Sequence, residues 1–112
     1  MAARAITLLT SAARTTSGAS DGTSAAAEFR EANVLLDITA VSGTSPSMTV
    51  TVESSPDGTS WFAHTAFPAK TAAGKDILKL GNLGSALRVS YAITGTTPSF
   101  TFSVVLDGKR VG

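Results

Sequence analysis

One ten-residue motif occurs twice in the chain, as GTSPSMTVTV at residues 43–52 and as GTTPSFTFSV at residues 95–104. Six of the ten positions are identical between the two copies. Each copy starts with a Gly, which tolerates positive φ, and continues to a Pro, which fixes φ and pushes the residue before it toward extended geometry. Both features favour a change of chain direction. The repeat therefore predicts one turn at residues 43–46 and a second at residues 95–98.

Apolar and polar residues alternate on both sides of each turn motif. An alternation with a period of two is typical of a strand that buries one face. After the motifs, the apolar positions are Met48, Val50 and Val52 in the first copy, and Phe100, Phe102, Val104 and Leu106 in the second. Before the motifs, they are Leu36, Ile38 and Ala40, and Leu87, Val89, Tyr91 and Ile93. We therefore expect each copy to close a β-hairpin, with one hairpin in each of two packed sheets.

Further strands and turns are expected around the two hairpins. Residues 5–10, 61–67 and 75–80 have the pattern of short strands, and Asp-Gly dipeptides at 57–58 and 107–108 predict tight turns, as does the sequence at 81–84. Residues 25–32 are either a weak strand or a helical turn, because Ala, Glu and Arg are strong helix formers.

The expected fold is all-β, an antiparallel β-sandwich of about seven or eight short strands with at most one short helix. We expect residues 1–20 to form an N-terminal strand or extended arm and residues 21–112 to form a single β-sandwich domain.

The composition narrows the classes of function. The chain has 112 residues, a formal net charge of +1 and no cysteine, and only 15% of its residues are charged. The scattered Lys and Arg residues make no basic stripe, which argues against nucleic acid as a partner. The lack of Cys removes disulfides, thiolate catalysis and Cys-ligated metal sites. No apolar stretch approaches the ~18 residues of a membrane-spanning helix, so we expect no membrane partner.

Three residues together resemble a hydrolase constellation. Ser20 lies in a G-x-S-x-G pattern at residues 18–22, and Asp57 and His64 follow it in the chain order of α/β-hydrolases. That motif belongs between a buried strand and a helix of a large parallel sheet, whereas this one lies in a Ser/Gly-rich stretch of a small antiparallel chain. His64 is the only histidine, and it has no neighbouring acidic cluster with which to close a metal site. We therefore predict no catalytic residues, no bound metal and no cofactor.

Trp61 is the one candidate for a ligand platform. It follows the turn-forming sequence SSPDGTS at residues 54–60, and an exposed Trp after a turn stacks on sugar rings in many carbohydrate-binding β-sandwiches. The competing interpretation is that Trp61 starts a strand and buries its ring in the core, as most tryptophans do.

The chain also resembles a known group of proteins. The segments ITLLTSAARTTSG (6–18), FREANVLLDITAVSGTSPSMTVTVESSPDGTSW (29–61) and LRVSYAITGTTPSFTFSV (87–104) are similar to small proteins encoded among the virion structural genes of tailed bacteriophages. The resemblance implies a non-enzymatic virion protein, made in the cytoplasm of the host bacterium. The role it implies first is capsid decoration, or cement, on the head exterior, with a tail-associated role as the alternative. Its implied partners are the major capsid protein or other virion subunits, with a homo-oligomer on the particle.

The N-terminal segment is the candidate for attachment to such a partner. It has little strand patterning beyond Ile6 and Leu8 and no acidic residue before Asp21, and its small polar residues favour a flexible arm. Arg4, Ile6 and Leu8 are therefore the predicted partner contacts. The alternative is that this segment is a strand of the domain's own sheet.

Overall fold

The computed structural model describes residues 3–20, 29–57, 59–81 and 86–110. These residues form only strands, with no helix among them, and all the strand pairs are antiparallel. The expected all-β antiparallel fold is confirmed. The strands are β1 (Ala3–Arg14), β2 (Gly18–Ala19), β3 (Phe29–Ser55), β4 (Phe62–Ala66), β5 (Gly74–Gly81) and β6 (Ala86–Arg110).

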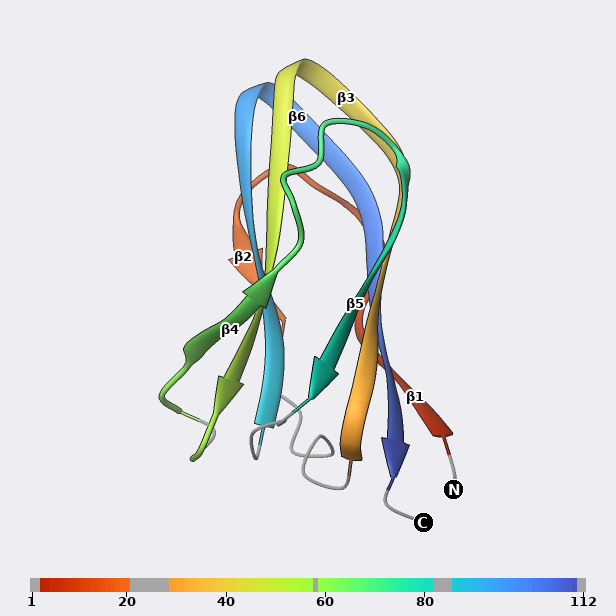
Figure 1. The fold of residues 1–112 in the computed structure, drawn as a ribbon. Helices are drawn as coiled ribbons and strands as arrows, with labels where there is room; N and C mark the ends of the chain where they lie inside the picture. The colour runs from red at the N-terminus through yellow and green to blue at the C-terminus, as the bar shows by residue number, and fades with distance from the viewer. Residues whose placement is uncertain (1–2, 21–28, 58, 82–85, 111–112) are drawn as a thin grey trace.

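Two long strands form the frame of the molecule. β3 and β6 pair with each other along almost their whole length, from Phe29 opposite Arg110 to Ser55 opposite Ala86. Figure 1 shows that both strands rise side by side, bend over at the top of the view and descend again. The pair is therefore a two-stranded ribbon folded over on itself, and its two arms make two layers.

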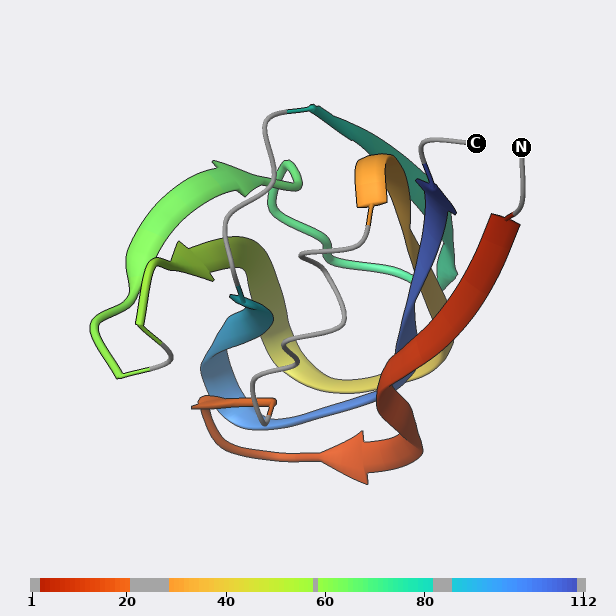
Figure 2. The same ribbon diagram turned by 90° about the horizontal axis from the view of Figure 1, so that it is seen from below.

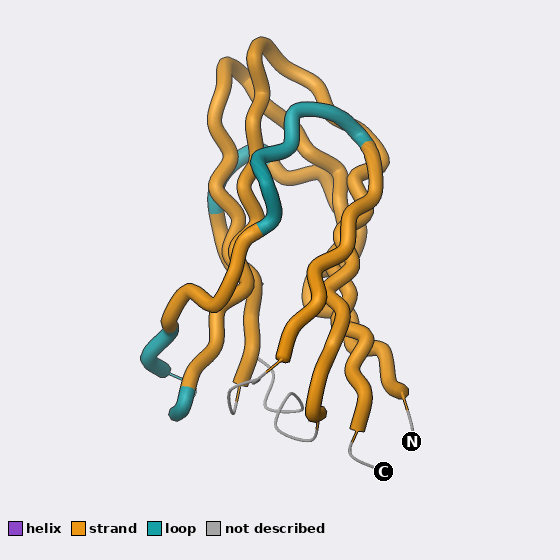
Figure 3. Tube along the Cα trace, viewed as in Figure 1, coloured by secondary structure: helices purple, strands orange, loops and turns teal. Residues whose placement is uncertain are grey.

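The short strands extend each layer. The layer that holds the first arm of β3 and the second arm of β6 is flanked by β5 and β1, and the other layer is flanked by β4 and β2. Seen from below, these two groups lie on opposite sides of the interior (Figure 2). Figure 3 shows that the described loops are few, mostly the connection that leads from β4 over to β5.

The prediction that each motif closes a hairpin is wrong. Neither β3 nor β6 pairs with itself, and the ladder between them continues through the motifs, with Ser42 opposite Ser99 and Thr44 opposite Thr96. The motif bends each strand without ending it, because residues of the motif in β3 pair with residues of the motif in β6. For this reason the described residues contain two long strands and four short ones in place of seven or eight short strands.

The two bends have the same backbone conformation and pack closely against each other. The first has positive φ at Gly43 (111°) and Ser45 (48°), and the second at Gly95 (125°) and Thr97 (50°). A Cβ added at Gly43 would lie 2.6 Å from the carbonyl oxygen of Thr97, and one added at Gly95 would lie 2.9 Å from that of Ser45. The sequence is therefore repeated because the two motifs cross, and each glycine makes room for the other copy's backbone.

The core lies between the two layers and confirms the predicted faces of the long strands. Tyr91 is half-buried, with its ring edge-on to Phe102 at 5.4 Å between centroids. Ala40, expected to be buried, is exposed, because a register shift between Ile38 and Ala40 moves it out of phase. The buried hydrophobic residues are Ala32, Val34, Leu36, Ile38, Met48, Val50, Val52, Phe67, Leu80, Ala86, Leu87, Val89, Ile93, Phe100, Phe102, Val104 and Leu106.

The remaining local predictions have mixed outcomes. The strands expected at residues 5–10, 61–67 and 75–80 correspond to β1, β4 and β5. The turn expected at 107–108 is wrong, since β6 continues there with Asp107 opposite both Asn33 and Ala5. A bend does follow β3 at 56–57, although residue 58 lies outside the described residues. Residues 82–84 of the turn predicted at 81–84 also lie outside the described residues. Of the ambiguous stretch 25–32, residues 29–32 are strand and 25–28 lie outside the described residues.

The two halves of the chain are interleaved. β1 and β2, from the first half, pair with β6 of the second half. β4 and β5, from the second half, pair with β3 of the first half. Among the described strands, every short strand therefore joins the long strand of the opposite half.

Candidate interaction surfaces

The N-terminal segment is built into the fold as a strand. β1 pairs with β6 from Ala3 opposite Lys109 to Arg14 opposite Phe100, with two register shifts. Of the three predicted partner contacts, Ile6 and Leu8 are half-buried and pack against the core. Arg4 is paired through its backbone with Gly108, and its side chain lies outside what the structure describes. The strand alternative therefore holds for residues 3–14.

Arg14 holds the end of this strand in place, although no sequence pattern predicted a role for it. Its guanidinium donates hydrogen bonds to the carbonyl oxygens of Thr10 (2.8 Å), Phe102 (2.9 Å) and Ala12 (3.1 Å). The same group lies over the ring of Phe102, 4.7 Å from its centroid. A guanidinium satisfied by three carbonyls and an aromatic face is positioned for structure, and it leaves little capacity for a ligand.

The three residues of the hydrolase pattern do not come together. Ser20 is buried beside β6, where its hydroxyl accepts a hydrogen bond from the backbone N–H of Val89 at 3.0 Å. His64 is exposed on β4, which lies at the opposite edge of the same layer, beyond both β6 and β3. A nucleophile and its base must be within hydrogen-bond reach, and two intervening strands separate these two side chains.

Asp57 has a structural role in the bend after β3. Its carboxylate accepts hydrogen bonds from the backbone N–H groups of Ser60 (2.8 Å) and Thr59 (2.9 Å) and from the Ser55 hydroxyl (3.0 Å). These bonds, led by the one from Ser60, hold the pKa of the Asp57 carboxyl well below its usual range. The ionised side chain therefore pins the bend that leads into β4.

Trp61 is half-buried and one face of its ring is occupied. The guanidinium of Arg88 lies over the ring, 4.6 Å from its centroid, and Arg88 Nε donates to Glu53 Oε1 at 2.6 Å. Since a sugar platform needs an open ring face, this arrangement leaves at most the other face of Trp61 for a ligand. The adjacent Phe62, at the start of the edge strand β4, is far more open, with 61% of its surface exposed.

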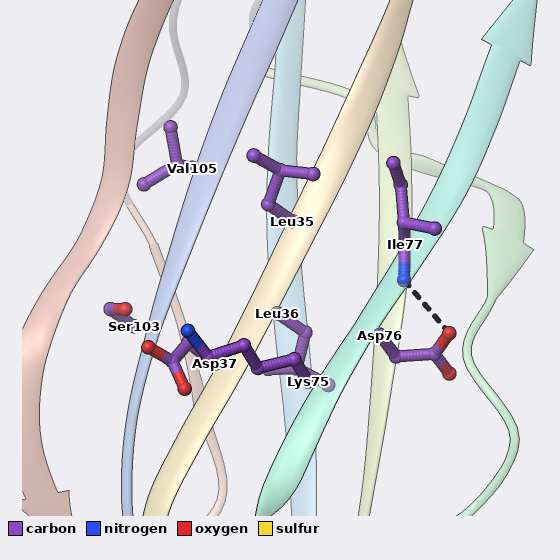
Figure 4. A pocket seen from close by; sticks show the side chains of 8 residues that line it. All are labelled: Leu35, Leu36, Asp37, Lys75, Asp76, Ile77, Ser103 and Val105. Carbon is purple, nitrogen blue, oxygen red and sulfur yellow. Dashed lines mark hydrogen bonds between the residues drawn. The ribbon is translucent and has the colours of Figure 1, made fainter.

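A second apolar surface lies on the outer face of the layer that contains β5. Val105, Leu35 and Ile77 are direct cross-strand neighbours on β6, β3 and β5, and their side chains stand in a row (Figure 4). Leu35 is 37% exposed and Ile77 is 47% exposed. We call these three residues the apolar row. The row lines an open hollow of about 430 Å³.

Polar residues flank the apolar row on both sides. One neighbouring row is Ser103, Asp37 and Lys75, and Lys75 extends across β3 toward Asp37 (Figure 4). The other neighbouring row is Asp107, Asn33 and Lys79. The face therefore has an apolar centre with charges of both signs at its margin.

The sequence contains a signal for this surface. Each of the three strands contains two adjacent apolar residues where the alternation calls for one: Leu35-Leu36, Ile77-Leu78 and Val104-Val105. In a strand, adjacent side chains point to opposite faces, so one member of each pair has to face outward. The sequence does not show that Leu35, Ile77 and Val105 are cross-strand neighbours. Only the strand register shows this.

Neither a metal-binding cluster nor a membrane-spanning helix is found among the residues that the structure describes. Within residues 3–20, 29–57, 59–81 and 86–110, no group of three or more His, Asp or Glu side chains is placed to hold a metal ion. The described part of the chain also contains no helix of the length and apolarity needed to cross a membrane. No family model matches the chain, and a search of curated proteins finds no match either.

Proposed function

We propose that the protein is a non-enzymatic structural component of a tailed-phage virion, and that it binds the exterior of the head as a decoration protein. The proposal rests on the resemblance to virion proteins along residues 6–18, 29–61 and 87–104, and on the character of the exposed surfaces. The side chains that suggested chemistry, Ser20 and Asp57, make structural hydrogen bonds.

The observation that carries the proposal is the exposed aromatic edge at β4. Phe62 is the most exposed large hydrophobic side chain of the described residues, and it opens an edge strand that pairs only with β3 among them. An edge strand offers backbone donors and acceptors to a further strand, and an exposed aromatic side chain supplies apolar contact beside them. Such an edge fits docking onto a protein shell, where many copies each make a small contact.

The direct experiment is quantitative mass spectrometry of purified phage particles from the phage that encodes this chain. Hundreds of copies per particle would support the head, a handful would point to a vertex or tail tip, and absence from the particle would refute the proposal. A rise in Trp61 fluorescence with added sugars, together with absence from particles, would favour a carbohydrate-binding module.

The role of the β4 edge is tested by adding the purified protein to particles assembled without it. We expect Phe62→Ser to weaken binding at least about tenfold, as for a central apolar contact. Ala66→Ser, an exposed position on the same strand, is the matched control and should bind like the unmodified protein. Equal binding by all three proteins would exclude this edge as the contact.

A further inference from the structure

We propose that the outer face carrying the apolar row is the interface of a homodimer, and that its occupant is a second copy of this chain packed face to face through a twofold axis. The inference concerns the isolated protein in solution. It goes beyond the proposed virion role and stands or falls independently of it.

The position of the apolar row points to a contact with another protein surface. Val105, Leu35 and Ile77 are consecutive neighbours across three strands, at the centre of the face. Leu36, Leu78 and Val104, the inward neighbours of these three residues, already pack into the protein's own core. The outward side chains of the apolar row therefore contribute nothing to the packing of one copy. A row of adjacent apolar side chains on an otherwise polar face marks a contact with another protein surface.

The arrangement of charge on this face selects the partner. On this face β5 presents Lys75 and Lys79 on either side of Ile77, whereas β6 presents Asp107 beside Val105. The charge therefore changes from basic to acidic across the sheet, from β5 to β6. Neither Lys79 nor Asp107 has an ion pair with another described residue. The two residues lie on either side of Asn33, so their strands are about two strand spacings, or 10 Å, apart.

Two copies can pack face to face about a twofold axis in two ways, and in only one of them do the basic residues of β5 lie opposite the acidic residue of β6. An axis parallel to the strands and centred on β3 places β5 of one copy over β6 of the other, so Lys79 meets the second copy's Asp107 twice. An axis perpendicular to the strands places β5 over β5 and brings lysines together. Both arrangements stack the apolar rows. The parallel axis also sets Asp37 and Glu31 of β3 opposite the same residues of the second copy, and Lys75, which extends toward Asp37, offsets one of these like-charge contacts. The two Lys79–Asp107 contacts favour the parallel axis over the perpendicular one, which brings only lysines together.

The usual geometry of packed sheets is compatible with this pairing. Two packed sheets lie about 10 Å apart and about 30° from each other, which moves a neighbouring strand by about 2 to 3 Å along its length. The flexible stem of Lys79 absorbs a displacement of that size.

The overlapping area limits the expected affinity. Under the axis centred on β3, only β6, β3 and β5 have a strand opposite them; these three span about 14 Å, and residues 31–39 of β3 span about 30 Å, which gives roughly 430 Å² per copy. A pair would bury about 860 Å², below the lower limit of about 1,200 Å² for stable complexes and typical of weak, transient ones. We therefore expect a weak dimer with a dissociation constant in the upper micromolar range.

The test is the molar mass in solution, measured by analytical ultracentrifugation from about 1 μM to 1 mM, a range that brackets such an affinity. Leu35→Glu places a charge in the middle of the interface on both copies, and we expect it to weaken dimerisation at least about 100-fold. Thr49→Glu is the matched control, because it introduces the same residue on the same strand, on the outer face of the other layer. It should leave the dimer intact, and circular dichroism should show that both variants keep a β-sheet spectrum.

A charge-reversal cycle tests the predicted axis. Lys79→Asp and Asp107→Lys alone each set like charges against each other at two places and should weaken the dimer at least about tenfold. The double variant restores opposite charges and should recover dimerisation to within a few-fold of the original.

Several results would overturn the inference. A protein that stays monomeric up to 1 mM, a Thr49→Glu variant that dissociates as much as Leu35→Glu, or a double reversal no better than the single ones would each do so. So would a monomer whose Leu35→Glu variant loses binding to particles, because the occupant of the face would then be the shell. The copy number on purified particles decides the virion role separately.

Discussion

The crossing of the two motifs makes a quantitative prediction about Gly43. In Gly43→Ala the new Cβ would lie 2.6 Å from the Thr97 carbonyl oxygen and 2.8 Å from the Pro98 Cα, with φ at +111°. The backbone strain contributes about 1 to 3 kcal/mol, and the forced shift of two packed backbone segments about 1 to 3 kcal/mol more. We expect a loss of about 2 to 6 kcal/mol in the free energy of unfolding, out of a total of about 5 to 15 kcal/mol.

The assay is urea unfolding followed by circular dichroism and Trp61 fluorescence, with the slope against urea checked for constancy. Gly74→Ala is the matched control, because Gly74 also has an unusual φ (+157°) but no atom within 4 Å of the added Cβ. Gly95→Ala, whose Cβ would lie 2.9 Å from the Ser45 carbonyl oxygen, should fall between the two. If Gly74→Ala costs as much as Gly43→Ala, the close approach of the motifs contributes nothing and the reasoning fails.

The remaining predictions concern the core, the first strand and the bend after β3. Phe102→Ala should cost about 3 to 5 kcal/mol in chemical denaturation, because its side chain is fully buried, whereas Thr101→Ala should cost less than about 1 kcal/mol; the reverse order would invert the assigned faces. Deleting residues 1–12 removes most of β1, so thermal unfolding should show a melting temperature lower by about 10 °C or more, on the scale of about 4 °C per kcal/mol. An unchanged melting temperature would contradict the role of β1 in the fold. The lowered pKa of Asp57 means that its carboxylate stabilises the folded state above the ordinary value of 3.8, and that this contribution is lost as the pH falls from there toward the folded pKa. Asp57→Asn should therefore show a shallower loss of stability in acid titrations than the unmodified protein, and identical titrations would show that the bend does not need the charge.

The sequence determines which face of each strand is buried, and this part of the prediction holds. Whether Phe102 or Thr101 points inward depends only on the local alternation, because the pleat assigns neighbours to opposite faces. The same logic located the strands around Leu8, His64 and Leu78. The G-T-(S/T)-P-S motif is different, because its Gly and Pro are compatible with a hairpin turn and also with a bend in a continuous strand. Local geometry does not distinguish the two.

The strand with which each motif pairs decides between a hairpin turn and a bend in a continuous strand. That pairing depends on residues far away in the sequence. Ser47 pairs with Thr94 and not with a residue a few positions away, because the second motif offers a matching bend against which the first packs. The apolar row depends on register in the same way, since Leu35, Ile77 and Val105 become neighbours only after three strands are aligned. The role of Arg14 was likewise invisible, because its acceptor on Phe102 is distant in the chain.

The interleaving of the halves has a consequence for how the protein is made. During synthesis the chain emerges from the ribosome at about 5 to 20 residues per second, N-terminus first. The partners of β1, residues 100–109 of β6, lie roughly 90 residues further along the chain, so they appear after a delay of about 4 to 20 seconds at that rate. Until then β1 lacks its partner, because among the described strands it pairs only with this part of β6. The native sheet therefore cannot be completed before the second arm of β6 has been made, and a product that ends before residue 100 would expose unpaired strand edges open to aggregation.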